Sequence, residues 1–106
     1  MLSELDKSRA FQEAEKVFKD FPQIFNDESQ AEVTLCYDGR EYRVDKIAKI
    51  DGETWIIDFK TGLQCQIIPQ YRQQLIRYKN IYENINGLKT RAAILWTKTL
   101  SLVEVI

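Results

Sequence analysis

The chain contains no histidine and only two cysteines, Cys36 and Cys65, which lie far apart in its 106 residues. Zinc sites and iron–sulfur clusters are built mainly from these two residue types, usually in closely spaced pairs. The sequence therefore argues against both kinds of centre. We expect the two cysteines to be free thiols in a reducing cytoplasm.

Long apolar runs are also absent. No segment approaches the roughly 18 apolar residues of a membrane span, and residues 1–10 lack the profile of a signal peptide. Fifteen Lys and Arg residues against 16 Asp and Glu residues leave a formal net charge of −1, so no overall basicity indicates nucleic acid. We expect a cytoplasmic protein with no membrane partner, whose function depends on local patterns.

The remaining composition is that of an ordinary globular protein, with 44% hydrophobic, 11% aromatic and 29% charged residues. A chain of this length supports one hydrophobic core. We therefore predict a single domain over residues 1–106.

Apolar residues recur at helical spacing in two segments. The first begins near Ser3, which with Asp6 resembles a capping box, and ends near Pro22. The second begins at Pro69 and stops at Asn86-Gly87, because glycine favours the left-handed conformation that ends a helix. One face of the second helix carries Tyr71, Leu75, Tyr78, Tyr82 and Ile85.

Extended runs separated by Asp38-Gly39 and Asp51-Gly52 lie between these helices. Asp-Gly favours a two-residue hairpin turn, in which both positions need positive φ. The predicted strands are residues 31–37, 40–50, 53–60, 91–97 and 101–106. A right-handed crossover through the second helix makes the third and fourth strands parallel. The predicted fold is α/β (α+β), in the order α-β-β-β-α-β-β, with a mixed sheet covered by helices.

The registers of the two hairpins bring charges together. Two-residue turns place Glu32 opposite Asp45 and Asp45 opposite Asp58, with Arg43 opposite Lys60. Three carboxylates then share one face, and Lys60 joins their row because it lies two residues beyond Asp58. Like charges directly opposite one another destabilise a sheet, so the row needs a neutralising partner such as a divalent cation.

The apolar residues between these charges are expected to point to the other face, toward a core. They are Val33, Leu35, Tyr42, Val44, Trp55, Ile57 and Phe59. One face would then be buried and the other left for chemistry. A surface network in which Arg43 and Lys60 balance Asp45 and Asp58 would tolerate the same pattern, and isolated Asp-X-Lys triplets occur by chance.

Three short segments are together similar to a known family. In order, YRVDKI (42–47), IIDFKTG (56–62) and YRQQLIRY (71–78) resemble the nuclease domain of the RecB and AddA type. Such domains lie at the C-terminus of bacterial UvrD-like helicase–nucleases and belong to the PD-(D/E)XK superfamily. The resemblance covers residues 32–82. It implies a restriction-endonuclease-like αβββαβ core, DNA as the substrate, and a helicase motor domain in the same or a partner chain.

Residue by residue, the resemblance makes Asp45 and Asp58 the metal-binding acids and Lys60 the lysine of the Asp-X-Lys element. Gln74 and Tyr78 match the family's Q-L-x-x-Y helix, which flanks the active site. On periodicity alone Tyr78 is a core residue, whereas the resemblance turns its hydroxyl toward the site. The basic residues of this helix either hold phosphates or only meet solvent: Arg72, Arg77 and Lys79.

Ligands that are all oxygen atoms suit Mg²⁺ or Mn²⁺. The implied ligands are Asp45, Asp58 and the backbone carbonyl of Phe59, with Glu32 as a looser match. The ion would lower the pKa of a bound water and stabilise charge on the cleaved phosphodiester. Lys60 could act as a base or as an electrostatic group, and nearby carboxylates favour the protonated, electrostatic role.

The sequence departs from the family at two points. A further histidine or acid is usual upstream of the first strand; Glu13 or Glu15 could replace it, or it lies before Met1. No phosphate-binding loop is present, so we expect the C-terminal piece of a larger helicase–nuclease. The leading hypothesis is a magnesium-dependent DNA exonuclease domain of DNA repair and recombination. The alternative is a non-catalytic DNA-binding or interaction module that retains the fold. An RNA-binding sheet lacks the exposed aromatic pair it would need.

Overall fold

Both Asp-Gly pairs form hairpin turns, as predicted. In the computed structural model, which describes residues 15–61 and 68–106, Asp38 and Gly39 have φ angles of 50° and 72°. Asp51 and Gly52 have φ angles of 52° and 79°. Two successive positive φ angles are typical of a type I′ turn, whose twist matches that of the paired strands. These four residues therefore determine where each hairpin folds back.

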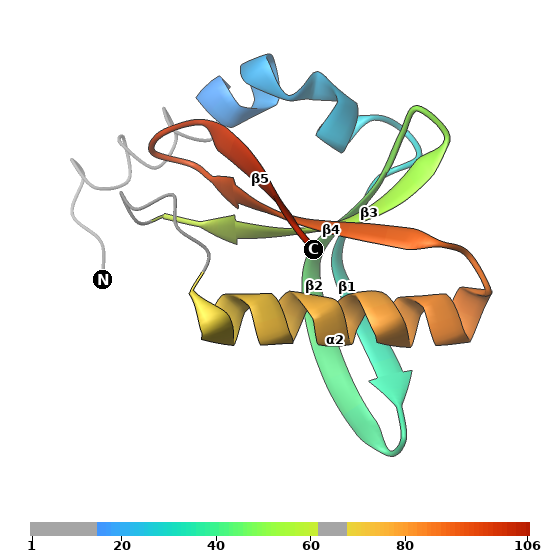
Figure 1. Cartoon of the computed structure of the whole chain (residues 1–106). Helices are drawn as coiled ribbons and strands as arrows, with labels where there is room; N and C mark the ends of the chain where they lie inside the picture. The colour runs from blue at the N-terminus through green and yellow to red at the C-terminus, as the bar shows by residue number, and fades with distance from the viewer. Residues whose placement is uncertain (1–14, 62–67) are drawn as a thin grey trace, which may run out of the picture.

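Five strands form one mixed sheet in the order β1-β2-β3-β4-β5 (Figure 1). They are β1 (Gln30–Tyr37), β2 (Arg40–Ile50), β3 (Glu53–Lys60), β4 (Thr90–Trp96) and β5 (Ser101–Val105). The pair β3 and β4 is parallel and the other neighbours are antiparallel. The five predicted strands and the parallel pair are thus confirmed. The domain is a small α+β unit.

The long helix α2 (Pro69–Asn86) connects β3 to β4. It begins with a proline, which lacks the N–H that a first turn leaves unpaired. It ends at Gly87, whose φ angle is 68° and whose N–H donates to the carbonyl of Glu83. Residues 15–20 are helical and are followed by the short 3-10 helix η1 (Pro22–Phe25). The remainder of the predicted first helix lies outside the described residues.

Helices cover both faces of the sheet. In Figure 1, α2 crosses one face and the N-terminal helical segments, drawn in blue, lie on the other. The α2-side cluster has at its centre Leu35, Val44, Ile56, Leu75 and Ile94, and the other-side cluster has Val17, Ile24, Ala48, Ile57 and Leu95. Burying each large aliphatic side chain contributes about 1.5–3 kcal/mol. No helix in the described part of the chain is long and apolar enough to cross a membrane.

The apolar residues of the first three strands do not share one face, so that prediction is wrong. Residues of β1 and β2 pack in the α2-side cluster, whereas those of β3 pack in the other-side cluster. The first group is Val33, Leu35, Tyr42 and Val44; the second is Trp55, Ile57 and Phe59. The sheet therefore has no free face.

The cause is a shift in the side-chain alternation of β2 at Asp45. Val44 and Ile47 both belong to the α2-side cluster, although they are three residues apart. Lys46 points to the other side, where its Nζ lies 4.6 Å from the centre of the Phe25 ring. Strict alternation would put Val44 and Lys46 on the same face and Val44 and Ile47 on opposite faces. The prediction assumed a constant register along the strand, so it could not reveal this shift.

The face of α2 also differs from the prediction at its C-terminal end. Leu75 is fully buried, and Tyr71, Tyr78 and Tyr82 pack on the α2-side cluster. Ile85, however, is 48% exposed, while Ile81 is buried at 5%. The buried stripe of α2 therefore ends one turn earlier than the spacing indicated.

Candidate active site

Asp45, Asp58 and Lys60 come together where β2 and β3 diverge. Oδ2 of Asp58 lies 2.9 Å from Nζ of Lys60, and the two side chains are 13% and 25% exposed. Oδ2 of Asp45 accepts a hydrogen bond of 3.0 Å from the backbone N–H of Phe59. The carboxyl group of Asp45 lies close enough to that of Asp58 to raise its pKa. We call these three side chains the acid–lysine group.

The strands place the acid–lysine group on the side of the sheet covered by α2. Ile56 belongs to the α2-side cluster, and Asp58 and Lys60 follow it at steps of two along β3. The registers follow the predicted pairing, but the β2–β3 ladder ends at Lys46 and Ile57. The predicted pairs of Asp45 with Asp58 and of Arg43 with Lys60 lie beyond that end. Beyond the last backbone pair of β2 and β3, the side chain of Asp45 accepts the hydrogen bond from the Phe59 N–H.

The carboxyl group of Asp58 is poorly compensated. Burial, together with the neighbouring Asp45, raises the pKa of Asp58 to about 6, against the opposing effect of Lys60. Its Oδ2 atom is buried and, despite the ion-pair distance to Lys60, accepts no hydrogen bond of regular geometry. A buried carboxylate with so few donors favours a further positive partner.

The ammonium of Lys60 is held between a carboxylate and an aromatic ring. Its Nζ atom lies 4.4 Å from the centre of the Tyr71 ring, and that ring packs on Trp96 at 6.2 Å. Burial alone would lower the pKa of Lys60, but Asp58, with smaller contributions from Tyr71 and Asp45, outweighs it and raises the pKa. Lys60 is therefore protonated at neutral pH, as the electrostatic role requires.

A cavity of about 480 Å³ opens beside Lys60 and is bounded by α2. Gln74 and Tyr78 line it together with Lys60, and Nε2 of Gln74 donates a 3.0 Å hydrogen bond to the hydroxyl of Tyr78. The Tyr78 ring is half-buried and meets Tyr42 edge-on at 6.2 Å. The residues of the Q-L-x-x-Y match therefore lie in the same cavity as Lys60.

Glu32 stands apart from the acid–lysine group. It has a φ angle of 52° at the point of β1 where the register skips a pair. Its carboxylate lies 3.4 Å from the guanidinium of Arg43, and both side chains are more than 70% exposed. Within residues 15–61 and 68–106, no three Asp, Glu or Cys side chains are grouped so that they could hold a metal ion. A metal role for Glu32 stays a prediction.

The donors of the acid–lysine group fit a hard divalent cation in kind. Asp45 and Asp58 offer two adjacent carboxylates, and the buried Oδ2 of Asp58 has an incomplete set of partners. Oxygen donors of this type suit Mg²⁺ or Mn²⁺. The carbonyl of Phe59 as a third ligand stays a prediction, as does Glu13, which lies outside the described residues. Glu15 is exposed on the helix covering the opposite face.

Sequence reasoning missed two features near this site. Tyr71 was assigned only to the apolar stripe of α2, yet its ring supports the Lys60 ammonium. Lys46 was given no role, yet it is only 7% exposed and burial lowers its pKa. The spacing of Tyr71 one turn before Gln74 could have indicated the first. The second depends on the alternation shift in β2, which leaves no sequence signal.

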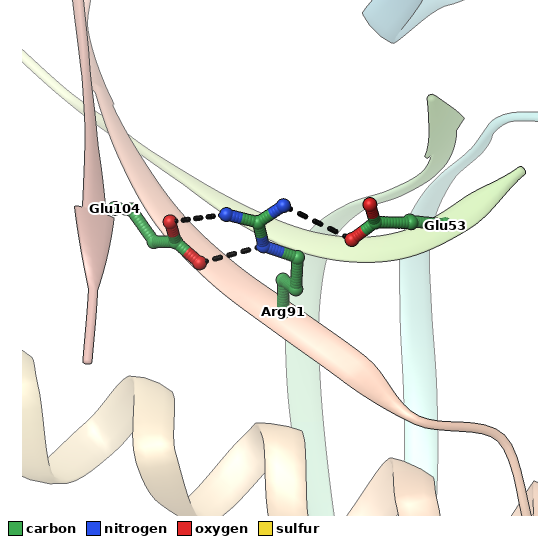
Figure 2. A network of polar contacts seen from close by, with 3 residues as sticks. All are labelled: Glu53, Arg91 and Glu104. Atoms are coloured by element: carbon green, nitrogen blue, oxygen red, sulfur yellow. Dashed lines mark hydrogen bonds and ion pairs between the residues drawn. The ribbon is translucent and has the colours of Figure 1, made fainter. Parts of the chain in front are cut away.

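A second charged cluster lies on the opposite face of the sheet, at the far end of β3. Figure 2 shows Arg91 between Glu104 and Glu53. The guanidinium of Arg91 makes hydrogen bonds of 2.7 and 2.6 Å to the two oxygens of Glu104 and one of 3.0 Å to Glu53. It also lies 4.3 Å above the Trp55 ring. We call these three charged residues the arginine cluster.

Comparison with known proteins finds no family and only distant structural similarity. No protein-family model matches the chain, and no curated protein matches it. Among solved structures, the protein SSO0001 is 13% identical with a TM-score of 0.47, over 92% of this chain and 52% of that one. Protein VC1899 from Vibrio cholerae is 20% identical with a TM-score of 0.41, over 85% of this chain and 23% of that one. This chain thus spans about half of the first protein and a quarter of the second.

Proposed function

We propose that this domain is a Mg²⁺-dependent deoxyribonuclease, acting as an exonuclease within a cytoplasmic helicase–nuclease of DNA repair and recombination. The observation that carries the proposal is the acid–lysine group beside the cavity that also holds Gln74 and Tyr78. Lys60 connects the two halves of the motif set, because it pairs with Asp58 next to Asp45 and also lines the cavity that holds Gln74 and Tyr78. Chance matches would not be expected to converge in space.

The order of the elements also supports the proposal. A helix, three antiparallel strands, α2 and a strand parallel to β3 follow one another along the chain. This is the order of the αβββαβ core of restriction-endonuclease-like proteins. Because one fold can serve several functions, the order raises the expectation and the site residues carry the chemistry.

In the proposed mechanism, Asp45 and Asp58 are the residues that would hold a divalent cation. When bound, such an ion activates water and stabilises negative charge on a phosphodiester. Lys60, kept protonated by Asp58, places a positive charge beside the scissile phosphate. Tyr71 and Asp58 fix the Lys60 ammonium from two sides. The Gln74–Tyr78 hydrogen bond positions an amide and a hydroxyl at the wall of the cavity to orient the DNA strand.

One observation favours the alternative of a non-catalytic DNA-binding or interaction module. In the described part of the chain, two carboxylates rather than three approach each other at the site. Such a module would keep the cavity and its basic residues but would not hold the ion strongly enough to cleave DNA. Metal binding therefore separates the two functions.

The test is a Mn²⁺ titration by calorimetry, combined with cleavage of linear DNA in Mg²⁺. Asp58→Asn is expected to abolish both metal binding and cleavage, because it removes the charge of the less compensated carboxylate. Asp45→Asn is expected to weaken both while retaining an oxygen for the Phe59 N–H. Glu104→Gln, in the arginine cluster, is the matched control and leaves both unchanged. Metal binding that survives Asp58→Asn, or wild-type protein that binds DNA without cleaving it, would refute the nuclease proposal.

A further inference from the structure

A second cavity continues from the first along α2. It has a volume of about 410 Å³ and lies between α2 and the end of β1 at Tyr37. Gln73 and Arg77 line both cavities, so the two are adjacent and share a wall. Both volumes fall within the roughly 300–1,000 Å³ typical of ligand sites. A ligand that enters beside Lys60 can therefore extend past Arg77 toward the β1–β2 turn.

Among residues 15–61 and 68–106, no acidic side chain lines either cavity. This is notable in a chain whose acidic residues outnumber its basic ones, 16 to 15. The second cavity is lined instead by Arg72, Arg77 and the amides of Asn80 and Asn84. These groups can donate hydrogen bonds to an anion, and no carboxylate from the described part of the chain competes for them there.

Arg77 is the more available of the two arginines. The Nε atom of Arg72 donates a 3.0 Å hydrogen bond to the carbonyl of Ile106, which ties Arg72 to the end of the chain. The side chain of Arg77 makes no hydrogen bond or ion pair with any other residue in the described ranges, and it is exposed. Its position on the wall shared by the two cavities places it where a ligand would pass from one to the other.

Tyr37 is a large aromatic side chain left 43% exposed at the outer end of the second cavity. It is the last residue of β1, directly before the Asp38-Gly39 turn. An exposed ring beside a basic residue is the arrangement on which bases of single-stranded nucleic acid stack while their phosphates pair with the charge. The paired bases of a duplex do not present their faces to a side chain in this way.

We propose that the second cavity is a docking subsite for single-stranded DNA, in which a base stacks on Tyr37 and a phosphate binds Arg77. The subsite rests on the proposed nuclease function, because it receives the part of the strand that continues beyond Lys60. It lies outside the acid–lysine group and requires no metal. Its occupant is a single strand, because only unpaired bases can turn a face toward the Tyr37 ring.

The test is fluorescence anisotropy with labelled oligothymidine of about ten nucleotides, within the span that such binding surfaces cover. EDTA is present, so that neither metal binding nor cleavage contributes. Tyr37→Ala is expected to weaken binding about tenfold, as loss of one stacked base does, whereas Tyr37→Phe retains it. Arg77→Ala is expected to weaken binding and to lower the slope of log affinity against log salt concentration by about 0.7.

Lys89→Ala removes an exposed positive charge outside both cavities and serves as the control, with the salt slope unchanged. Tyr37 and Arg77 are both exposed, and circular dichroism verifies that each variant is folded. Unchanged affinity in Tyr37→Ala, or equal binding of a duplex of the same length, overturns the subsite. Absence of cleavage in Mg²⁺ together with Tyr37-dependent binding would instead refute the nuclease function and leave the subsite standing.

Discussion

The acid–lysine group and the arginine cluster are built from the same kinds of charges but differ in how completely the charges are paired. In the arginine cluster, one guanidinium satisfies both oxygens of Glu104 and one oxygen of Glu53, in side chains that are 31–53% exposed. In the acid–lysine group, the one ammonium forms its ion pair with Asp58, which is only 13% exposed and also has the carboxyl group of Asp45 as a neighbour. The more buried group has the poorer partners.

The electrostatic consequences have opposite signs. Hydrogen bonding from Arg91 lowers the pKa of Glu104. Burial and Asp45 raise the pKa of Asp58 to about 6. A lowered carboxyl pKa means that the charges of the cluster already stabilise the carboxylate. A raised carboxyl pKa means that the carboxylate is under-compensated, so a further cation can bind favourably. The difference indicates a structural role for the arginine cluster and a binding role for the acid–lysine group.

The largest expected effect comes from removing the lysine of the acid–lysine group. Lys60→Met is expected to reduce DNA cleavage by about 100-fold or more, because it removes a positive charge placed at the developing negative charge. Arg91→Met removes a cation of the same charge from the arginine cluster and is expected to leave the cleavage rate unchanged. Single-turnover cleavage of labelled DNA measures both. Equal losses in the two variants would mean that Lys60 acts only through stability.

The next effect is on stability and its dependence on pH, measured in EDTA by urea unfolding followed through tryptophan fluorescence. The folded-state pKa of Asp58 is about 6 and its ordinary value is 3.8, so between these pH values the folded protein binds more protons than the unfolded chain. Stability therefore falls as pH rises from about 4 to 6. At pH 7, Asp58→Asn is expected to raise the free energy of unfolding, by an amount on the order of 2–3 kcal/mol. The gain should vanish below pH 4.

A smaller effect of opposite sign is expected in the arginine cluster. Because the pKa of Glu104 is lowered in the folded state, its contribution to stability is present above its ordinary value of 4.5 and is lost as pH falls through the folded-state value. Glu104→Gln should therefore destabilise the protein at pH 7 and flatten its loss of stability on acidification below pH 4.5. The same unfolding series measures it. A variant that responds to pH like Asp58→Asn would remove the contrast between the clusters.

The smallest effect is expected at Glu32, whose ion pair with Arg43 lies in solvent. Exposed pairs of this kind contribute about 0–1 kcal/mol, so Glu32→Gln should barely change the free energy of unfolding. Calorimetric titration of Glu32→Gln with Mn²⁺ tests separately whether Glu32 is a metal ligand. A loss of affinity matching that of Asp58→Asn would add Glu32 to the ligands and extend the acid–lysine group to three strands.

Much of the fold could be predicted because its signals are local. The two Asp-Gly turns, the Gly87 stop and the strand that follows α2 each depend on a few adjacent residues. The register also followed from the turns, and with it the approach of Asp45 to Asp58 and Lys60. These were predictable because hairpin geometry relates distant residues through a short turn.

The parts that escaped prediction depend on contacts between elements. The alternation shift at Asp45 accompanies the positive φ of Glu32, a residue type that does not favour it. This shift moved the acid–lysine group from a free face to the face covered by α2. Ile85 lies on the apolar stripe of α2 and is nevertheless 48% exposed, which depends on what packs against the end of the helix. Neither property is encoded in the spacing of residues along one element.

The two-residue turn at Asp51-Gly52 has a consequence for the order in which the molecule assembles. It makes the acid–lysine group the product of one hairpin, which can close within microseconds, whereas the cavity wall needs the chain to return through α2 and pair β4 with β3. We therefore expect Asp45, Asp58 and Lys60 to come together before α2 forms the cavity wall beside them. In pulsed hydrogen exchange during refolding, the amides of β2 and β3 should become protected before those of α2.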